Sequence, residues 1–152
     1  MNTFQQYLSL QDNLIQEQLK PTYRPSNFHD LSHQLRQLHE QLNPYQINKA
    51  WEIYHNDLLK ANPKEWFAAS IDELYDNKLW STLYTKGGQD DYQAEFLISE
   101  FLPMDKLTLG SIFFWYIFPK HSILTSRKTV YTKEDIEAAD QWVNKYMNWF
   151  KE

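Results

Sequence analysis

The chain has 152 residues, a formal net charge of -5, no Cys and 16% aromatic residues. At this length one domain is the default, and the aromatic content favours a packed core over disorder. Without Cys there is no disulfide scaffold, Cys-ligated metal site or thiol catalysis. The excess of 20 Asp and Glu over 15 Lys and Arg disfavours nucleic-acid binding. We therefore expect one domain over residues 1–152 that binds no nucleic acid.

The residue composition favours helices over strands. Only three Gly and two Val occur in the chain, and strands are rich in Val while tight hairpin turns use Gly. The sequence therefore predicts an all-α fold, a compact single-domain bundle of about seven helices. An α+β fold is the alternative, with a small sheet formed by Leu79–Lys86 and Ser111–Val130.

The N-terminal third predicts three amphipathic helices. The first spans Thr3–Leu19 and ends before Pro21, because a residue that precedes Pro is disfavoured in the α region. The second spans Asn27–Leu42 and has a leucine stripe with helical spacing. In the third, Asn43 is the N-cap and Pro44 the first helical residue. The stripe comprises Leu31, Leu35, Leu38 and Leu42.

A second Asn-Pro pair, Asn62-Pro63, predicts the start of a fourth helix, in which Phe67, Ile71 and Leu74 face inward at helical spacing. The following Leu79–Lys86 segment is ambiguous between helix and strand. Gly87-Gly88 is the clearest break in the chain. Three further helices are expected after it: from Asp90 or Asp91 through Leu102, from Asp105 to Phe118 as the central buried element, and from Thr132 to Phe150. For Ser111–Phe118 a buried strand is the competing interpretation.

Acidic residues form the candidate binding site. On the predicted fourth helix they lie opposite the apolar stripe, and further acids follow across the Gly87-Gly88 turn. Such a cluster suits docking of a basic protein, although charge runs are usually solvated surface. The candidate partner-binding acids are Glu65, Asp72, Glu73, Asp76, Asp90, Asp91 and Glu95.

Two tryptophans of the last predicted helix extend this hypothesis. Trp142 and Trp149 are seven residues apart and lie at the edge of the inward stripe. Trp is a frequent hot spot of protein interfaces, so both are candidate anchors for a partner. The alternative is that they widen the contact of this helix with the core.

Histidines provide the competing function class, a small metal- or ligand-binding helical bundle with possible enzymatic activity. His29 and His33 have i, i+4 spacing, but they lie opposite the leucine stripe and lack a third ligand. Glu52 and His55 form one Glu-x-x-His unit, whereas di-iron bundles need two. We expect no metal, no cofactor and no catalytic residues.

The sequence thus predicts a non-enzymatic interaction module with an acidic binding face. An immunity protein or antitoxin that neutralises a basic effector is a concrete version of it. The N-terminus lacks the features of a signal peptide, and the longest apolar run, Ile112–Phe118, is too short to span a membrane. We expect a cytoplasmic protein without a membrane partner. The oligomeric state is left open.

Overall fold

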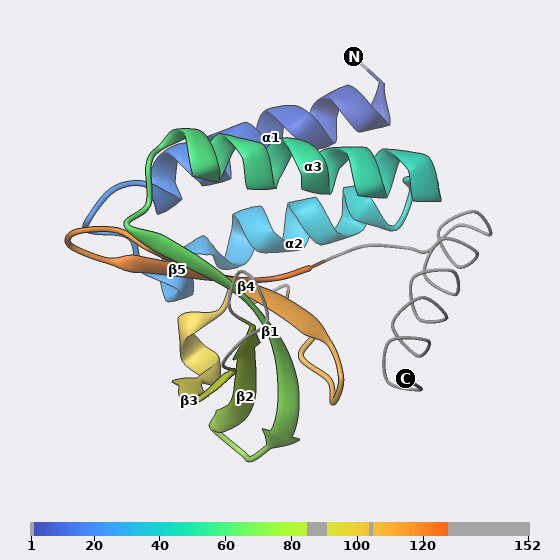
Figure 1. The fold of residues 1–152 in the computed structure, drawn as a ribbon. Coiled ribbons are helices and arrows are strands. Elements are labelled where there is room, and N and C mark those ends of the chain that lie inside the picture. Colours follow the sequence, from blue (N-terminus) through green and yellow to red (C-terminus); the bar gives the residue numbers. More distant parts are fainter. Residues whose placement is uncertain (1, 85–90, 104, 128–152) are drawn as a thin grey trace, which may run out of the picture.

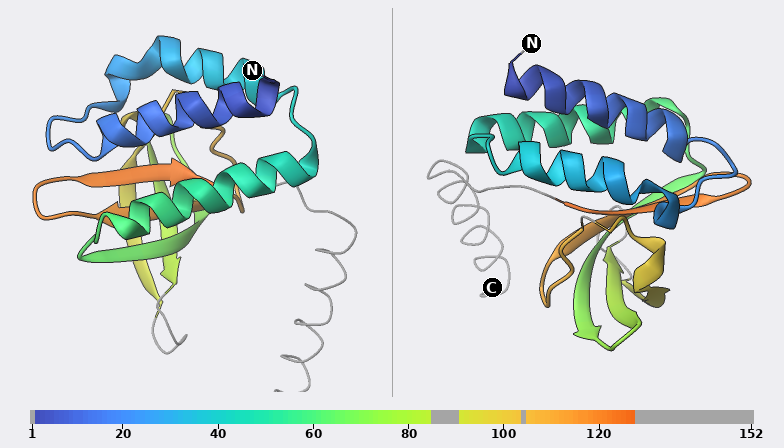
Figure 2. Two further views of the ribbon diagram at one scale, coloured as in Figure 1. Left: turned by 90° about the horizontal axis from the view of Figure 1, so that it is seen from above. Right: turned by 180° about the vertical axis from the view of Figure 1, so that it is seen from behind.

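The computed structural model describes residues 2–84, 91–103 and 105–127, and it has an α+β fold. Three helices lie on one side of a five-stranded antiparallel sheet with the strand order β3-β2-β1-β4-β5 (Figures 1 and 2). The helices are α1 (Thr3–Gln18), α2 (His29–His39) and α3 (Pro44–Lys60), with short 3₁₀ turns η1 (Pro25–Phe28) and η2 (Ile98–Glu100). The strands are β1 (Glu65–Leu74), β2 (Lys78–Tyr84), β3 (Tyr92–Leu97), β4 (Ile112–Ile117) and β5 (Ser122–Ser126).

The three predicted N-terminal helices are confirmed, with small changes at their ends. α1 and α3 both begin with a complete capping box, in which Asn2 and Asn43 are the N-caps. Their side chains accept the N–H groups of Gln5 and Gln46, so orphan donors of the first turn are satisfied. Leu35 and Leu42 of the leucine stripe are buried in the core beneath the helices.

The predicted all-α bundle is wrong, because three expected helices contain strands. The fourth is β1, which pairs with β2 and β4. The helix expected up to Leu102 contains β3 and η2, and the helix expected over Asp105–Phe118 is a loop followed by β4. The sequence of β4 is a continuous apolar run because both faces of the strand are buried. Phe113 packs on one side of the sheet, and Phe114 and Tyr116 pack on the other.

Two of the described hairpin turns, β1–β2 and β4–β5, contain no glycine. The β1–β2 turn is closed by a hydrogen bond from the Tyr75 N–H to the Lys78 carbonyl, 2.8 Å. In the β4–β5 turn the Phe118 N–H bonds the His121 carbonyl, also at 2.8 Å. The scarcity of Gly therefore did not exclude a sheet. The predicted helix from Thr132 to Phe150 lies outside the described residues.

The sheet separates two hydrophobic clusters. The larger one fills the space between the helices and one sheet face, and it includes Tyr54 and Leu58 of α3 and Tyr116 of β4. The smaller one lies on the opposite face, where Phe96, Phe101 and Phe113 meet in edge-to-face contacts. In Figure 1 the helices lie above β4 and β5, while β1 bends away from them toward the β1–β2 hairpin. Part of the sheet thus extends beyond its helical cover.

Candidate protein-binding face

The helices leave a part of β1, β2 and β3 uncovered, which we call the open face. Residues that pair directly across antiparallel strands share a face. Ala68, which packs against the helical core, pairs with Tyr84, so the face beneath the helices continues outward onto β2. The open face comprises Ser70, Asp72, Glu73, Lys78, Trp80, Thr82, Tyr84, Gln93, Glu95 and Leu97.

A β-bulge brings two neighbouring carboxylates onto this face. The pairing of β1 with β2 passes from Ile71 opposite Ser81 to Glu73 opposite Trp80, so that Asp72 is the extra residue. In a regular strand successive side chains point to opposite faces, and a bulge changes that alternation. The Asp72 carboxylate accepts a hydrogen bond from the Thr82 hydroxyl, which places it beside Glu73 on the open face.

Neutral hydroxyl groups hold both carboxylates in place. Oδ2 of Asp72 accepts from Thr82, and Oε2 of Glu73 accepts from Tyr75. The hydrogen bond to Glu73 raises the pKa of Tyr75, because it favours the protonated phenol. Within the described part of the chain neither carboxylate forms a salt bridge. Both negative charges are therefore oriented without being neutralised.

Trp80 lies beside these carboxylates on the same face. Its side chain is 37% exposed, and it forms no ring contact with any described residue. Together with Asp72, Glu73 and Gln93 it lines a shallow groove of about 230 Å³. The open face therefore combines two fixed negative charges with an exposed tryptophan, a residue type that is enriched in interface hot spots.

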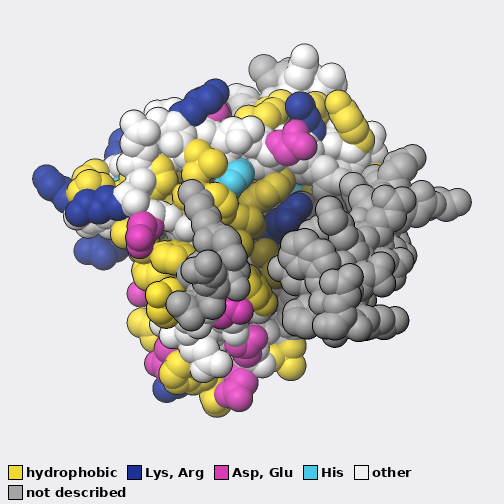
Figure 3. Space-filling view, viewed as in Figure 1, with side chains coloured by type: hydrophobic (Ala, Val, Ile, Leu, Met, Phe, Trp, Pro, Cys, Tyr) yellow, Lys and Arg dark blue, Asp and Glu magenta, His cyan; other side chains and the backbone are white. Residues whose placement is uncertain are grey.

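Charge is distributed unevenly between the helices and the open face. Residues 2–64 contain six basic and six acidic residues, whereas residues 65–84 and 91–103 contain one basic and seven acidic residues. Lys78 is the only basic residue of the five strands, and it pairs with Glu95 at 3.6 Å. Figure 3 shows acidic and hydrophobic side chains side by side over β1 and β2. This half of the molecule therefore carries a negative field.

The acids predicted as one helix face are only partly together. Asp72 and Glu73 share the groove, Glu95 lies opposite Trp80 on β3, and Asp76 is exposed in the β1–β2 turn. Glu65 lies at the other end of β1, roughly 20 Å away along the strand. The prediction that these acids share one helix face was wrong, because β1 is an extended strand. Asp91 is exposed just before β3, and Asp90, Trp142 and Trp149 lie outside the described residues.

The sequence prediction missed the aromatic half of the groove. Trp80, Thr82 and Tyr84 alternate with the buried Leu79 and Ser81 along β2. This period-two pattern is typical of a strand with one buried face. It was left ambiguous because the segment LWSTLYTK also fits a continuation of a helix.

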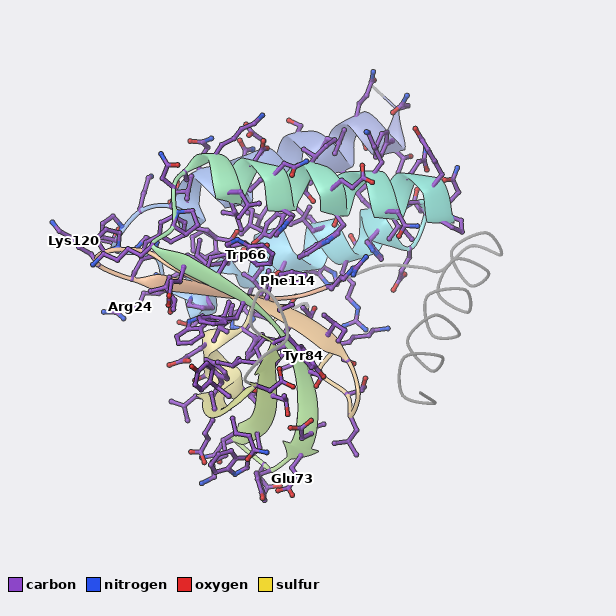
Figure 4. All side chains as sticks on the ribbon, in the orientation of Figure 1. Arg24, Trp66, Glu73, Tyr84, Phe114 and Lys120 are labelled. Carbon is purple, nitrogen blue, oxygen red and sulfur yellow. The ribbon has the colours of Figure 1, made fainter. Side chains whose placement is uncertain are left out.

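A second cluster of aromatic and polar side chains lies beneath α3, around His55. Its imidazole ring contacts Trp51, Trp66, Phe114 and Tyr116, with ring centroids 5.0–6.0 Å apart. Nδ1 of His55 lies 2.7 Å from the Tyr116 hydroxyl oxygen. In Figure 4, Trp66 and Phe114 lie just below α3, whereas Glu73 lies at the far end of the sheet. The two clusters are therefore distinct regions of one sheet face.

The protonation of the His55 cluster follows from its burial. Burial raises the pKa of Tyr116, so its hydroxyl keeps its proton and needs an acceptor. Nδ1 of His55 is the acceptor within reach among the described residues, which leaves the proton of the neutral ring on Nε2. Burial and then the positive Arg127 lower the pKa of His55. The ring is neutral at pH 7.

The residues weighed as metal ligands do not assemble. His29 and His33 are exposed on α2, and Glu52 pairs with Lys49 at 3.5 Å. His55 directs Nδ1 toward Tyr116. Within residues 2–84, 91–103 and 105–127 no group of three or more potential ligands is close enough to hold a metal ion.

Comparison with family models, curated proteins and solved structures finds no match to this chain. None of the described helices has the length and apolarity that crossing a membrane requires. The site geometry and the charge distribution are therefore the basis on which a function is inferred.

Proposed function

We propose that this protein is a non-enzymatic interaction module whose open face docks a basic protein. The observation that carries the proposal is the groove in which Trp80 lies beside two carboxylates without salt bridges to described residues. Complementary charge accelerates association and selects the partner, while a desolvated aromatic side chain supplies affinity. An immunity protein or antitoxin that covers a basic effector is the version of this function that we favour, acting in the cytoplasm.

The contrast with the acids of the helices supports this choice. Three of the six acids in residues 2–64 lie within 4.0 Å of a Lys or Arg on their own helix or at its end, namely Glu17, Glu40 and Glu52. Ion pairs of this kind are ordinary features of a solvated protein surface. Asp72 and Glu73 have hydroxyl partners in place of basic ones, and a basic partner would complete their electrostatic environment. The same carboxylates would compete with nucleic-acid phosphates for the basic groups of the partner.

We favour this function over the alternative, a small metal- or ligand-binding helical bundle with possible enzymatic activity. The bundle is replaced by a sheet, and the Glu52 and His55 side chains are engaged by Lys49 and Tyr116. The His55 cluster is tightly packed with aromatic rings, which is the expected arrangement of a structural element.

A charge-reversal experiment tests the proposal. Partners are captured from the native host with the wild-type chain, and their affinity is measured for Asp72→Lys/Glu73→Lys. The matched control is Asp12→Lys/Glu40→Lys, which changes the net charge equally at two exposed positions, one on α1 and one at the C-cap of α2. We expect a basic partner whose association slows as salt rises, and which the open-face variant loses while the control retains it. Equal affinity of both variants for the captured partner contradicts the proposal.

A further inference from the structure

We propose that the groove on the open face receives a single arginine side chain of the basic partner, stacked on Trp80. This inference rests on the proposed function and names the group that the groove recognises. Its basis is the geometry of the groove, in which a flat indole and two carboxylates border the same space of about 230 Å³.

The groove residues match the chemistry of a guanidinium group. Arginine presents a planar, delocalised cation whose face stacks on an aromatic ring while its five N–H donors point outward in the same plane. Trp80 offers the aromatic surface, because no described ring covers it. Asp72 and Glu73 lie beside it with oxygen atoms that can accept those donors.

The hydroxyl groups around the groove favour arginine over lysine. Oδ2 of Asp72 accepts from Thr82, and its Oδ1 accepts a longer bond of 3.5 Å from Ser70. Oε2 of Glu73 accepts from Tyr75. These bonds fix the direction of the remaining acceptor sites. A rigid fork gains most from acceptors that are fixed in this way, whereas a lysine ammonium is a compact charge that keeps its water. Gln93, the fourth residue of the groove, adds a neutral amide whose oxygen can accept a further N–H.

The position of Trp80 in the ladder explains why the groove is kept open. Trp80 lies opposite Glu73 on β1 and opposite Glu95 on β3. Its two cross-strand neighbours are thus carboxylates, and no apolar side chain packs directly across from it on this face. Glu95 is paired with Lys78 at 3.6 Å, so Glu73 is the cross-strand acid without a salt bridge to a described residue. An aromatic ring beside such an acid attracts a cation.

Peptide binding tests the inference. Three peptides of equal length are titrated at low salt into the full chain: a repeat of Arg-Gly-Gly, its Lys counterpart and its neutral citrulline counterpart. We expect the Arg peptide to bind at least about threefold more tightly than the Lys peptide, a preference in the range of a cation–π contact. The citrulline peptide should not bind. The indole N–H resonance of Trp80, assigned through Trp80→Leu, should move with the Arg peptide.

Two variants separate the inference from the proposed function. Trp80→Leu should reduce the affinity of the Arg peptide to that of the Lys peptide, while Tyr45→Leu, at an aromatic residue that is 71% exposed on α3, should change neither. If both peptides bind equally and Asp72→Lys/Glu73→Lys removes both, the acidic face stands and the arginine site is overturned. If neither peptide binds, both proposals fail.

Discussion

Trp66 and Trp80 lie on the same face of the sheet, one beneath α3 and the other beyond the helices. Trp66 packs edge-on against His55 at 5.0 Å and stacks with Phe114 at 6.0 Å. Trp80 has carboxylates as its cross-strand neighbours and a groove at its side. Tryptophan therefore has two roles in this sheet: Trp66 packs against the helical core, and Trp80 is available to a partner.

The polar groups of the two regions also differ: they are neutral and packed under α3, and charged and accessible on the open face. Under α3 the hydrogen bond between Tyr116 and His55 joins two neutral groups. On the open face the hydroxyl groups of Thr82 and Tyr75 hold charged carboxylates that stay accessible. Stability should therefore depend on the first region and binding on the second.

The largest expected effect on stability is in the covered region. Phe114→Ala should lower the free energy of unfolding by about 3–5 kcal/mol, because it removes a buried ring and leaves a cavity. Trp80→Leu on the open face should cost no more than about 1 kcal/mol, because Trp80 is 37% exposed and an apolar side chain remains at the position. Urea unfolding of both variants measures the difference. Similar losses of unfolding free energy in the two variants would contradict the assignment of stability to the covered region.

A smaller effect is expected from the buried hydroxyl of the same cluster. Tyr116→Phe keeps the ring and removes the donor to Nδ1 of His55, which should cost about 1–2 kcal/mol. The equivalent change on the open face, Tyr84→Phe, removes the contact of its hydroxyl with Ser70, 2.8 Å, at an exposed site. It should cost less than about 0.5 kcal/mol. Thermal or urea unfolding checks the order of the two, and a reversed order would contradict the assignment.

The smallest effect concerns pH. His55 has a lowered pKa in the folded state, so as pH falls below about 6.5 the unfolded chain binds the proton first. Its contribution to stability is therefore complete above that pH and is lost as pH decreases. His55→Gln keeps an acceptor for Tyr116 without titrating. Between pH 7.5 and 5.5 the wild type should lose more stability than this variant, by less than about 1 kcal/mol because the ring is half-buried. Equal losses would show that His55 is not perturbed.

The sequence predicted the three helices and gave a sheet only as the alternative fold, over Leu79–Lys86 and Ser111–Val130. One physical reason is the range of the interactions involved. Capping boxes and leucine stripes are local, so α1, α2 and α3 could be located from neighbouring residues. β1 has apolar residues at helical spacing, Phe67, Ile71 and Leu74, and its extended form is decided by pairing with β2 and with the distant β4. No local pattern contains that information.

The two Asn-Pro pairs show the limit most clearly. Asn43 has an extended backbone, with φ -82°, and caps the start of α3. Asn62 has a φ of +58°, the left-handed conformation that Asn tolerates and that ends a helix. The same dipeptide thus begins one element and ends another, and the prediction treated both as starts.

The sequence predicted which acidic residues belong to the candidate site, but it did not predict the geometry of the groove. Asp72, Glu73, Asp76 and Glu95 were selected as acids near one another in sequence, and they do lie toward the same end of the sheet. The bulge that unites Asp72 with Glu73 and the pairing that adds Trp80 depend on strand register. Strand register could not be predicted once the segment was interpreted as a helix, because side-chain alternation and bulges are properties of paired strands.

Binding of a basic peptide can be mapped onto the open face and the His55 cluster in one experiment. An isotope-labelled chain is titrated with the Arg-Gly-Gly repeat, and the amide and indole resonances are followed by NMR. We predict that the resonances of Asp72, Glu73 and Trp80 move together, while those of Trp51 and His55 stay in place. Changes centred on the His55 cluster, with the open face unmoved, would contradict this prediction.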